Sequence, residues 1–271
     1  MLGPARGRTG GLVGEGSPAP IRHAGRGPAV LALHGFAGAP REVALVTDAA
    51  AKVGLAAYAP LLPGHGTHAR ELQLETFESW TAAALAALDE LSAGGASVVV
   101  AGISLGSVLA THLAVLRPRQ VAALVVLASA VRLNPVFPGL PLAALERTPL
   151  RAADLYVPKA GADIRDAVAA RTHLTYDLQP VRAAIEVVRA GRIVRGELAL
   201  VRCPTFVAHG ALDRVCPVGN ATHLARHVGT EDVELLILPR SAHIVTEDVE
   251  RELLAARLER FLRRVAPEAT A

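Results

Sequence analysis

A serine between two glycines is the residue of this sequence best suited to do chemistry. Ser104 is the centre of a G-x-S-x-G pattern at 102–106, directly after the apolar run 98–101 and directly before a helical pattern. A serine displayed on a sharp strand-to-helix turn has a strained backbone, and side chains two positions to either side would collide. An ordinary glycine-rich turn, the alternative, would need neither the strand nor the helix. We therefore predict that Ser104 is a nucleophile on such a turn.

A serine hydroxyl needs a general base, and the base needs an acid that orients it. The strand expected at Thr205–Ala208 runs into a loop that contains Asp213. The strand expected at Val233–Leu238 runs into His243, and of the ten histidines only this one stands between the last strand and the last helix. Asp213 and His243 are the predicted acid and base, in the chain order that such a turn favours. The alternatives are an aspartate that caps a helix and an exposed loop histidine.

Negative charge on a substrate carbonyl oxygen must be met by backbone N–H groups that are already in place. One predicted donor is the amide of Leu105, at the start of the helix that follows the serine. The other is Phe36, in the glycine-rich loop 34–38. We expect His34 to hold this loop by hydrogen bonding and His65, in a turn, to be structural.

Other kinds of site have weak support. His223 and His227 stand one helical turn apart, a spacing that can bind metal, but no embedded glutamate or third ligand accompanies them, so no metal site is predicted. The loop at 34–38 lacks the spacing of a nucleotide-binding motif. Cys203 and Cys216 suit free thiols in a reducing compartment. No cofactor is expected.

Composition narrows the class of protein. The 271 residues are 51% hydrophobic and carry a formal net charge of +3, with scattered basic side chains and only 3% aromatic residues, which argues against a nucleic-acid partner. The sequence contains no run of about 18 apolar residues, so no transmembrane segment is expected. The segment 1–27 lacks the apolar block of a signal peptide, so a cytoplasmic location is expected. The sequence gives no indication of the oligomeric state.

Short apolar runs alternate with amphipathic stretches, which predicts an α/β fold with a mostly parallel sheet flanked by helices. Strands are expected at Ala29–Leu33, Leu55–Ala59, Ser97–Ala101, Ala122–Ala128, Thr205–Ala208 and Val233–Leu238. Helices are expected at Arg41–Val53, Phe77–Ser92, Leu105–Arg117, Gly219–His227 and Thr246–Val265. A further strand in 11–23 is weakly indicated.

The segment 131–196 breaks this alternation. It begins proline-rich and continues with helices expected at Ala162–Arg171 and Pro180–Ala190, which predicts a small helical cap inserted before the last two strands. The expected organisation is an N-terminal segment at 1–27, partly flexible, core at 28–130 and 197–271, and the cap between them. Apolar side chains are expected to line a substrate pocket under the cap: Phe137, Leu155, Tyr176, Ile185 and Val215.

Five strings of the sequence resemble bacterial carboxylesterases and monoacylglycerol lipases of the α/β-hydrolase superfamily. They are LALHGFAGAPRE at 31–42, LLPGHG at 61–66, GISLGS at 102–107, GALDRVCP at 210–217 and SAHIVTED at 241–248. The resemblance extends over roughly residues 16–265, and the cap matches only in length and helical character. Ser107 departs from the second glycine that many relatives have. The resemblance implies the α/β-hydrolase fold, with Ser104, Asp213 and His243 as the catalytic triad and Phe36 and Leu105 as the oxyanion hole.

The chemistry expected from these residues is two-step acyl transfer on a small-molecule ester of short to medium acyl chain. A monoacylglycerol lipase or a thioesterase would use the same residues, and these alternatives stay open. A ligand-binding protein that has kept the fold without catalysis is the alternative from another class.

Overall fold

The computed structural model describes residues 8–135, 142–145, 148, 154–159 and 161–266. Its centre is a seven-stranded sheet with the strand order β11-β10-β6-β5-β3-β4-β2. These strands are β2 (Ile21–His23), β3 (Arg26–Leu33), β4 (Leu55–Ala59), β5 (Val98–Ile103), β6 (Val121–Leu127), β10 (Thr205–Gly210) and β11 (Val233–Leu238). Only β2 runs antiparallel to its neighbour, β4. The predicted mostly parallel sheet is therefore confirmed.

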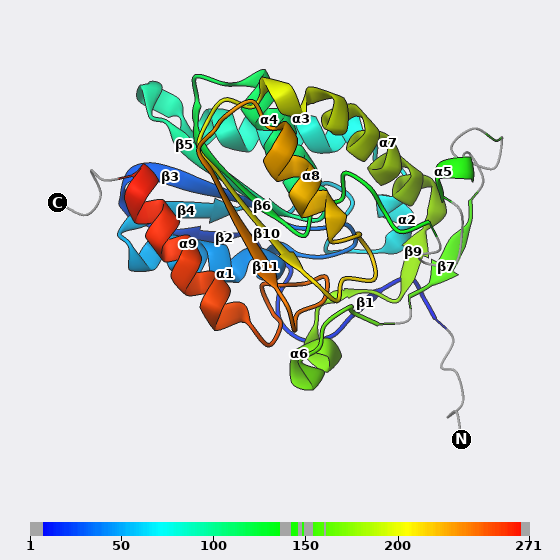
Figure 1. Cartoon of the computed structure of the whole chain (residues 1–271). Helices are drawn as coiled ribbons and strands as arrows, with labels where there is room; N and C mark the ends of the chain where they lie inside the picture. Colours follow the sequence, from blue (N-terminus) through cyan, green and yellow to red (C-terminus); the bar gives the residue numbers. More distant parts are fainter. Residues whose placement is uncertain (1–7, 136–141, 146–147, 149–153, 160, 267–271) are drawn as a thin grey trace.

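Helices cover both faces of the sheet (Figure 1). One face is covered by α1 (Ala44–Lys52) and α9 (Arg251–Val265), and the other by α3 (Phe77–Leu91), α4 (Leu105–Leu116), α7 (Val181–Glu197) and α8 (Gly219–His227). The central strand β5 is buried along its whole length, because a parallel strand between two helical layers has no solvent-facing side. Its continuous apolar run, VVVAGI, follows from that position.

Short elements complete the described chain. They are β1 (Leu12–Val13), β7 (Tyr156–Pro158), β8 (Thr175–Tyr176), β9 (Leu178–Pro180), α2 (Ala69–Leu72), α5 (Leu142–Leu145), α6 (Ala167–Thr172) and 3-10 turns at Pro40–Val43, Ala93–Gly95 and Leu198–Leu200. β1 pairs with β8, and β7 with β9, so the weakly indicated early strand is present in two pieces, β1 and β2.

Two predicted helix starts are wrong, each by five residues. The last helix begins at Arg251 and not at Thr246, because the Asp248 carboxylate accepts hydrogen bonds from the amides of Ala242 (2.7 Å) and Arg165 (2.8 Å) and holds this stretch as a turn. The first cap helix begins at Ala167 and not at Ala162. The side chain of Asp166 caps it by accepting from the amides of Val168 and Ala169.

The predicted cap segment is closely attached to the rest of the molecule. Its long helix α7 was expected to end at Ala190 but continues to Glu197 and packs against α4 and α3. β8 pairs with β1, so the N-terminal segment, of which residues 1–7 lie outside the described part, contacts the cap. The four-part division of the chain stays a prediction.

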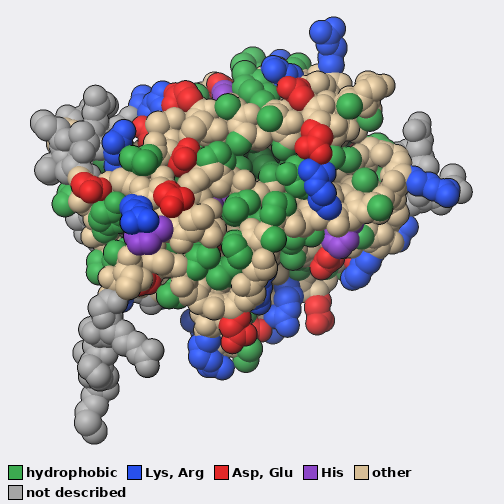
Figure 2. Space-filling view, turned by 180° about the vertical axis from the view of Figure 1, so that it is seen from behind, with side chains coloured by type: hydrophobic (Ala, Val, Ile, Leu, Met, Phe, Trp, Pro, Cys, Tyr) green, Lys and Arg blue, Asp and Glu red, His purple; other side chains and the backbone are tan. Residues whose placement is uncertain are grey.

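The described residues contain no membrane-spanning helix, and charges of both signs are mixed on the side that Figure 2 shows. Among the described residues, no helix combines the length and the apolar character needed to cross a bilayer. Figure 2 shows basic and acidic side chains interspersed among hydrophobic ones on the side opposite to that of Figure 1. Both cysteines are free, with Cys216 buried and Cys203 half-buried.

Candidate active site

The turn that presents Ser104 is sharply strained. Its φ of 54° and ψ of −119° lie outside the backbone regions that residues other than glycine ordinarily adopt. Such a conformation costs roughly 1–3 kcal/mol. A Cβ on Gly102 would lie 2.1 Å from the Gly106 carbonyl oxygen, and a Cβ on Gly106 would lie 2.0 Å from that of Leu33. The Ser104 amide donates to the Leu127 carbonyl at 3.0 Å, which anchors the turn on β6. The two glycines are needed for the reason that the sequence pattern indicates.

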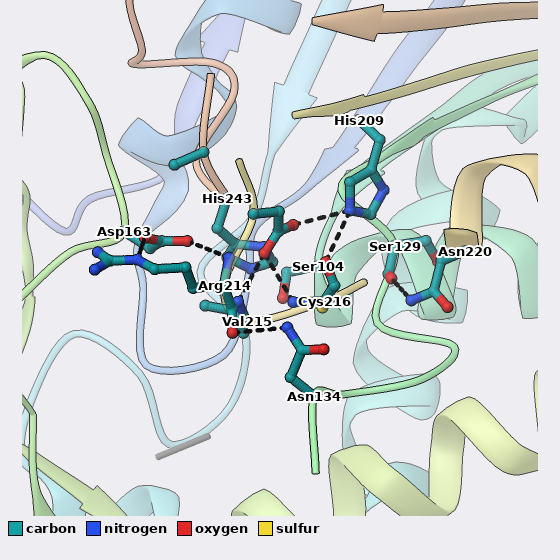
Figure 3. A network of polar contacts seen from close by, with 12 residues as sticks. Ser104, Ser129, Asn134, Asp163, His209, Arg214, Val215, Cys216, Asn220 and His243 are labelled. Atoms are coloured by element: carbon teal, nitrogen blue, oxygen red, sulfur yellow. Dashed lines mark hydrogen bonds and ion pairs between the residues drawn. The ribbon is translucent and has the colours of Figure 1, made fainter. Parts of the chain in front are cut away.

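Ser107, which stands where many of the resembled proteins have a glycine, stabilises this turn by hydrogen bonding. Its buried Oγ donates to the Ser104 carbonyl oxygen at 2.6 Å and also hydrogen-bonds the Ser129 Oγ at 2.9 Å. Asn220 in turn donates its side-chain amide to the Ser129 carbonyl oxygen at 2.7 Å (Figure 3). The hydroxyl therefore fastens the first turn of α4 to the loop that follows β6.

The structure brings Asp213 and His243 together. His243 Nδ1 donates to Asp213 Oδ2 at 2.8 Å, and Asp213 Oδ1 accepts from the amides of Val215 (2.8 Å) and Cys216 (2.7 Å). Burial on its own would raise the pKa of the Asp213 carboxyl. The attraction of His243 and the hydrogen bonds from the two neighbouring imidazoles outweigh burial and hold this pKa well below its usual range. Asp213 is therefore a carboxylate at neutral pH.

A second imidazole contacts the same carboxylate oxygen. His209 lies at the end of β10, has no exposed side-chain surface, and places its Nε2 2.9 Å from Asp213 Oδ2 and 3.2 Å from the Cys216 carbonyl oxygen (Figure 3). Both neighbours are acceptors, so Nε2 carries a proton. Sequence reasoning missed His209, although the spacing H-x-x-x-D at 209–213 is visible in the chain.

The cap segment touches the loop of the predicted base. The amide of His243 donates to the Asp163 carbonyl oxygen at 3.0 Å, and the Asp163 carboxylate accepts from Arg214 Nε at 2.6 Å and from the Arg214 amide at 2.8 Å. Burial would lower the pKa of His243, but the Asp213 carboxylate, with help from Asp163 and Glu42, raises the pKa above its ordinary value. Sequence reasoning did not single out Asp163.

The loop that carries Phe36 is held at almost every amide. The Gly35 amide donates to Glu42 Oε2 at 2.7 Å, the Ala37 amide to His65 Nε2 at 3.1 Å, and the Gly38 amide to the Gly35 carbonyl at 3.2 Å. Among the described residues, no acceptor within the chain engages the Phe36 amide. That amide is free to donate to a ligand, as the prediction of an oxyanion hole requires.

Two further observations concern the predicted oxyanion hole. Leu105 is the first residue of α4, so its amide has no acceptor within that helix and lies at the positive end of the helix dipole. His34 donates from Nδ1 to the Gly35 carbonyl at 2.9 Å and accepts the Leu62 amide on Nε2 at 3.0 Å. This agrees with the expectation that His34 holds the loop, and burial lowers its pKa, which keeps the ring neutral.

Ser104, His243, Phe36 and Gly35 line one cavity. With the solvent space at its open mouth included, it measures about 720 Å³. One part of the wall is apolar and another is polar. The apolar lining includes Leu133, Leu142, Val187 and Val215, and the polar lining includes Glu42, Lys159, His173 and Gln179.

Comparison with known proteins places this site in a family. The family model described as "Serine aminopeptidase, S33" matches residues 26–250. The chain belongs to this S33 hydrolase family. A thermostable monoacylglycerol lipase from Bacillus sp. (strain H-257) is 26% identical over 240 residues, which are 88% of this chain and 92% of the relative. A carboxylesterase from Bacillus subtilis (strain 168) is 24% identical over 253 residues, 92% of this chain and 98% of the relative.

Solved structures agree with this assignment. The chain resembles a structure reported with the metagenome-derived lipolytic enzymes LipS and LipT, with a TM-score of 0.83 and 29% identity over 92% of this chain and 98% of the other. It also resembles the monoacylglycerol lipase of Paleococcus ferrophilus, with a TM-score of 0.77 and 18% identity over 91% and 99% of the two chains. The α/β-hydrolase fold is confirmed, and this S33 family member is a hydrolase of the lipase/esterase type.

The predicted pocket residues of this S33 family member have different outcomes. Val215 lines the cavity, and Phe137 lies outside the described residues. Leu155 is 42% exposed, and Ile185 is buried in a small cluster with Leu142, Val181 and Ala184. Tyr176 is fully buried, because its hydroxyl donates to the Gly64 carbonyl (2.8 Å) and accepts the Thr67 amide (3.0 Å). Leu155, Tyr176 and Ile185 are thus not among the residues that line this cavity.

The polar wall contains the residues that sequence reasoning missed. Glu42 and His173 are buried there and form an ion pair, with His173 Nε2 3.3 Å from Glu42 Oε1. Lys159 Nζ donates to the Thr175 hydroxyl at 2.6 Å, and burial lowers the pKa of its amine to about 8. In the sequence these residues stand far apart, and although Glu42 ends the string at 31–42, no pattern links it to His173 or Lys159.

One group of side chains in the site could in principle hold a metal ion. Donor atoms of Asp213, Cys216 and His243 all lie within 4.8 Å of one another. However, the oxygens of Asp213 already accept four N–H donors, and burial raises the pKa of the Cys216 thiol well above its ordinary value. The arrangement suits hydrogen bonding between an acid and a base better than ligation. At the second candidate pair, His227 Nδ1 donates to the His223 carbonyl at 2.7 Å.

Proposed function

We propose that the chain hydrolyses carboxylic esters, with Ser104 as nucleophile, His243 as general base and acid, and Asp213 as the residue that orients His243. The observation that carries the proposal is the 2.8 Å hydrogen bond from His243 Nδ1 to Asp213, at the wall of the cavity that Ser104 also lines. With Nδ1–H committed to Asp213, the other ring nitrogen of His243 has a lone pair that can accept a proton. The strained turn at Ser104 supports the same assignment.

The proposed reaction has two steps. His243 takes the Ser104 hydroxyl proton while Oγ bonds to the ester carbonyl carbon, and the resulting oxyanion accepts hydrogen bonds from the amides of Phe36 and Leu105. Collapse breaks the bond to the alcohol oxygen, which leaves with the proton from His243. Water then adds to the acyl-enzyme in the same way and releases the carboxylic acid. Asp213 remains a carboxylate throughout, because its pKa is far below neutral.

The proposed substrates carry short to medium acyl chains. Leu133, Leu142, Val187 and Val215 form an apolar wall in the same cavity as Ser104. Each buried methylene stabilises the transition state by roughly 0.8 kcal/mol until the chain meets the end of the cavity. We expect kcat/KM to rise with acyl length and then fall, with an optimum on the order of four to ten carbons.

A monoacylglycerol is the second candidate substrate. Lys159 and Gln179 line the same cavity and offer polar groups that a hydroxylated alcohol could meet. The relative from Bacillus sp. named monoacylglycerol lipase gives this candidate further support. A thioester substrate would use the same catalytic residues and is distinguished only by assay.

The test is a substrate panel on the full chain. We expect hydrolysis of p-nitrophenyl esters with the acyl-length profile given above, and labelling of Ser104 by a fluorophosphonate located by mass spectrometry. Ser104→Ala should abolish both, while Ser17→Ala, at an exposed serine, should change neither. Activity of Ser104→Ala within about tenfold of the parent would overturn the assignment. A profile that peaks on acyl-CoA would replace the ester with a thioester, and no labelling at all would favour a binding protein.

A further inference from the structure

A buried histidine of the cap lies between two carboxylates that belong to the two catalytic loops. His173 Nε2 is 3.3 Å from Glu42 Oε1 and its Nδ1 is 3.1 Å from Glu247 Oε2. The side chains of His173 and Glu42 are 1% and 4% exposed. Glu42 follows the loop that carries Phe36, and Glu247 is four residues beyond His243. One side chain of the cap thus bridges the proposed oxyanion loop and the loop of the proposed base.

Glu42 connects this histidine directly to the oxyanion loop. Its second carboxylate oxygen, Oε2, accepts the Gly35 amide at 2.7 Å. The loop also closes tightly around the carboxylate, since a Cβ on Gly38 would lie 2.1 Å from Glu42 Oε1. Two residues after His173, the hydroxyl of Thr175 donates to the Ala37 carbonyl at 2.8 Å. The amide of Phe36 is therefore fixed from both sides by groups that depend on the cap or on Glu42.

The geometry favours a charged ring at His173, with Nδ1 hydrogen-bonded to Glu247 at 3.1 Å and Nε2 at ion-pair distance from Glu42 but not aligned for a hydrogen bond. Both ring nitrogens face carboxylate oxygens, and a neutral imidazole would turn one lone pair toward a negative charge. Glu42, Glu247 and Lys159 are the charged groups that act on the ring. Burial and the Lys159 ammonium lower the pKa of His173, but the two carboxylates raise it above its ordinary value. At neutral pH we take the cluster as an imidazolium between two carboxylates.

We propose that His173 is a positioning residue for the reaction: as an imidazolium it holds Glu42, and through it the Phe36 amide, against the loop of His243. The inference rests on the proposed function, since it concerns the geometry of that oxyanion hole. Neutralising the ring leaves one proton for two carboxylates, so one of the two contacts is lost. Activity then falls on the alkaline side as His173 loses its proton.

The sign of the pH effect follows from the raised pKa. A histidine whose pKa is higher in the folded state stabilises that state fully below about pH 6.5, its unfolded pKa. The stabilisation is lost as the pH rises through the folded-state pKa. Removing one carboxylate lowers that pKa, so the alkaline loss of activity should move to lower pH. The Lys159 amine, with a pKa of about 8, titrates in the same region, but its effect would persist in a variant without His173.

The test compares His173→Gln and Glu247→Gln with the matched control His112→Gln. His112 also bonds a glutamate, Glu197, at 2.7 Å, but neither residue lines the cavity. We expect kcat on a p-nitrophenyl ester to fall about 10- to 100-fold in His173→Gln, with KM changed by less than about threefold. Deleting an oxyanion donor itself typically costs more, about 10²–10³-fold. The alkaline limb should disappear in His173→Gln, move to lower pH in Glu247→Gln, and stay in place in His112→Gln.

A second measurement does not depend on turnover. In ¹⁵N spectra of the full chain carrying Ser104→Ala, the His173 ring, identified by its absence in His173→Gln, should show both nitrogens protonated at pH 7. A neutral ring overturns the proposal whether or not the chain hydrolyses esters. Unchanged kcat and an unchanged alkaline limb in folded His173→Gln also overturn it, even if Tm falls. These two results can be told apart from a failure of the proposed function. In that case the parent chain itself would show no ester hydrolysis and no labelling of Ser104.

Discussion

Replacing Asp213 by asparagine tests the proposed triad more sharply than removing the Asp213 side chain. The carboxylate accepts four N–H groups: the amides of Val215 and Cys216 on Oδ1, and the rings of His243 and His209 on Oδ2. Asparagine offers one acceptor oxygen and one donor nitrogen in nearly the same shape. If its oxygen keeps the two backbone amides, its NH₂ faces two ring nitrogens that both carry protons.

The rearrangement of lowest energy that avoids these opposed donors is a change of the His243 tautomer, and it disables the base. His243 moves its proton from Nδ1 to Nε2, so that Nδ1 accepts from the asparagine and no lone pair is left for the Ser104 proton. Turning the amide round instead would set its NH₂ against two backbone N–H groups, a loss of two buried hydrogen bonds. Holding a catalytic histidine in the wrong tautomer costs about 10⁴-fold in kcat, which corresponds to about 5 kcal/mol.

The assay is steady-state hydrolysis of p-nitrophenyl butyrate near neutral pH, with Asp48→Asn, an exposed aspartate, as control. We expect Asp213→Asn to lose about 10⁴-fold in kcat with near-parental KM, and His243→Ala to lose more, because there the proton acceptor itself is gone. Circular dichroism checks that the variant is folded. A loss below about tenfold in folded Asp213→Asn would refute the assignment and place the acid elsewhere.

Four further outcomes are expected. His243 must lose a proton before it can act as a base, and its pKa is raised above the ordinary value. We therefore expect kcat/KM to increase with pH through a midpoint above about 6.5. A midpoint below about 6 in the pH–rate profile would contradict this. Tyr176→Phe should lower the free energy of unfolding in urea by about 1–2 kcal/mol without changing the acyl-length profile, since its hydroxyl makes two buried hydrogen bonds away from the cavity. Val187→Phe should shift the acyl-length optimum to shorter esters, and an unchanged profile would mean that the acyl chain lies elsewhere. Treatment with EDTA should leave turnover unchanged, whereas loss restored by a divalent ion would point to the Asp213, Cys216 and His243 donors.

The features that could be predicted from the sequence are those determined by neighbours along the chain. The glycines around Ser104 and the buried run of β5 each follow from local sterics and periodicity. The positions of Asp213 and His243 follow from the rule that loops at the carboxyl ends of parallel strands meet at one edge of the sheet. The start of α9 could not be predicted, whereas the local cap Asp166 indicates the start of α6. The hydrogen bonds of Asp248 to Arg165 and Ala242 include a partner 83 residues away in the chain.

Tyr176 shows why the pocket was harder to predict than the triad. An aromatic residue in the cap region suits a pocket wall by composition alone, but the side chain turns away because its hydroxyl finds partners at Gly64 and Thr67, 112 and 109 residues earlier. Composition identifies which side chains are apolar. It does not identify which of them have a polar group that a distant backbone satisfies.

The predicted cap of this hydrolase contacts the loops of the proposed acid and base through Asp163 and the loop of Phe36 through Thr175, which links the stability of the cap to the proposed catalysis. Asp163 bonds the loop of the proposed acid through Arg214 and the loop of the base through the His243 amide. His173 contacts Glu42 and Glu247 on the other side. At His173 and Glu42, whose side chains are 1% and 4% exposed, a charge left without its partner costs several kcal/mol, so opening of the cap at this pair is disfavoured. Substrate exchange is then expected through the open mouth of the cavity, with β8 held on the loop of Phe36 by the hydrogen bond from Thr175 to Ala37.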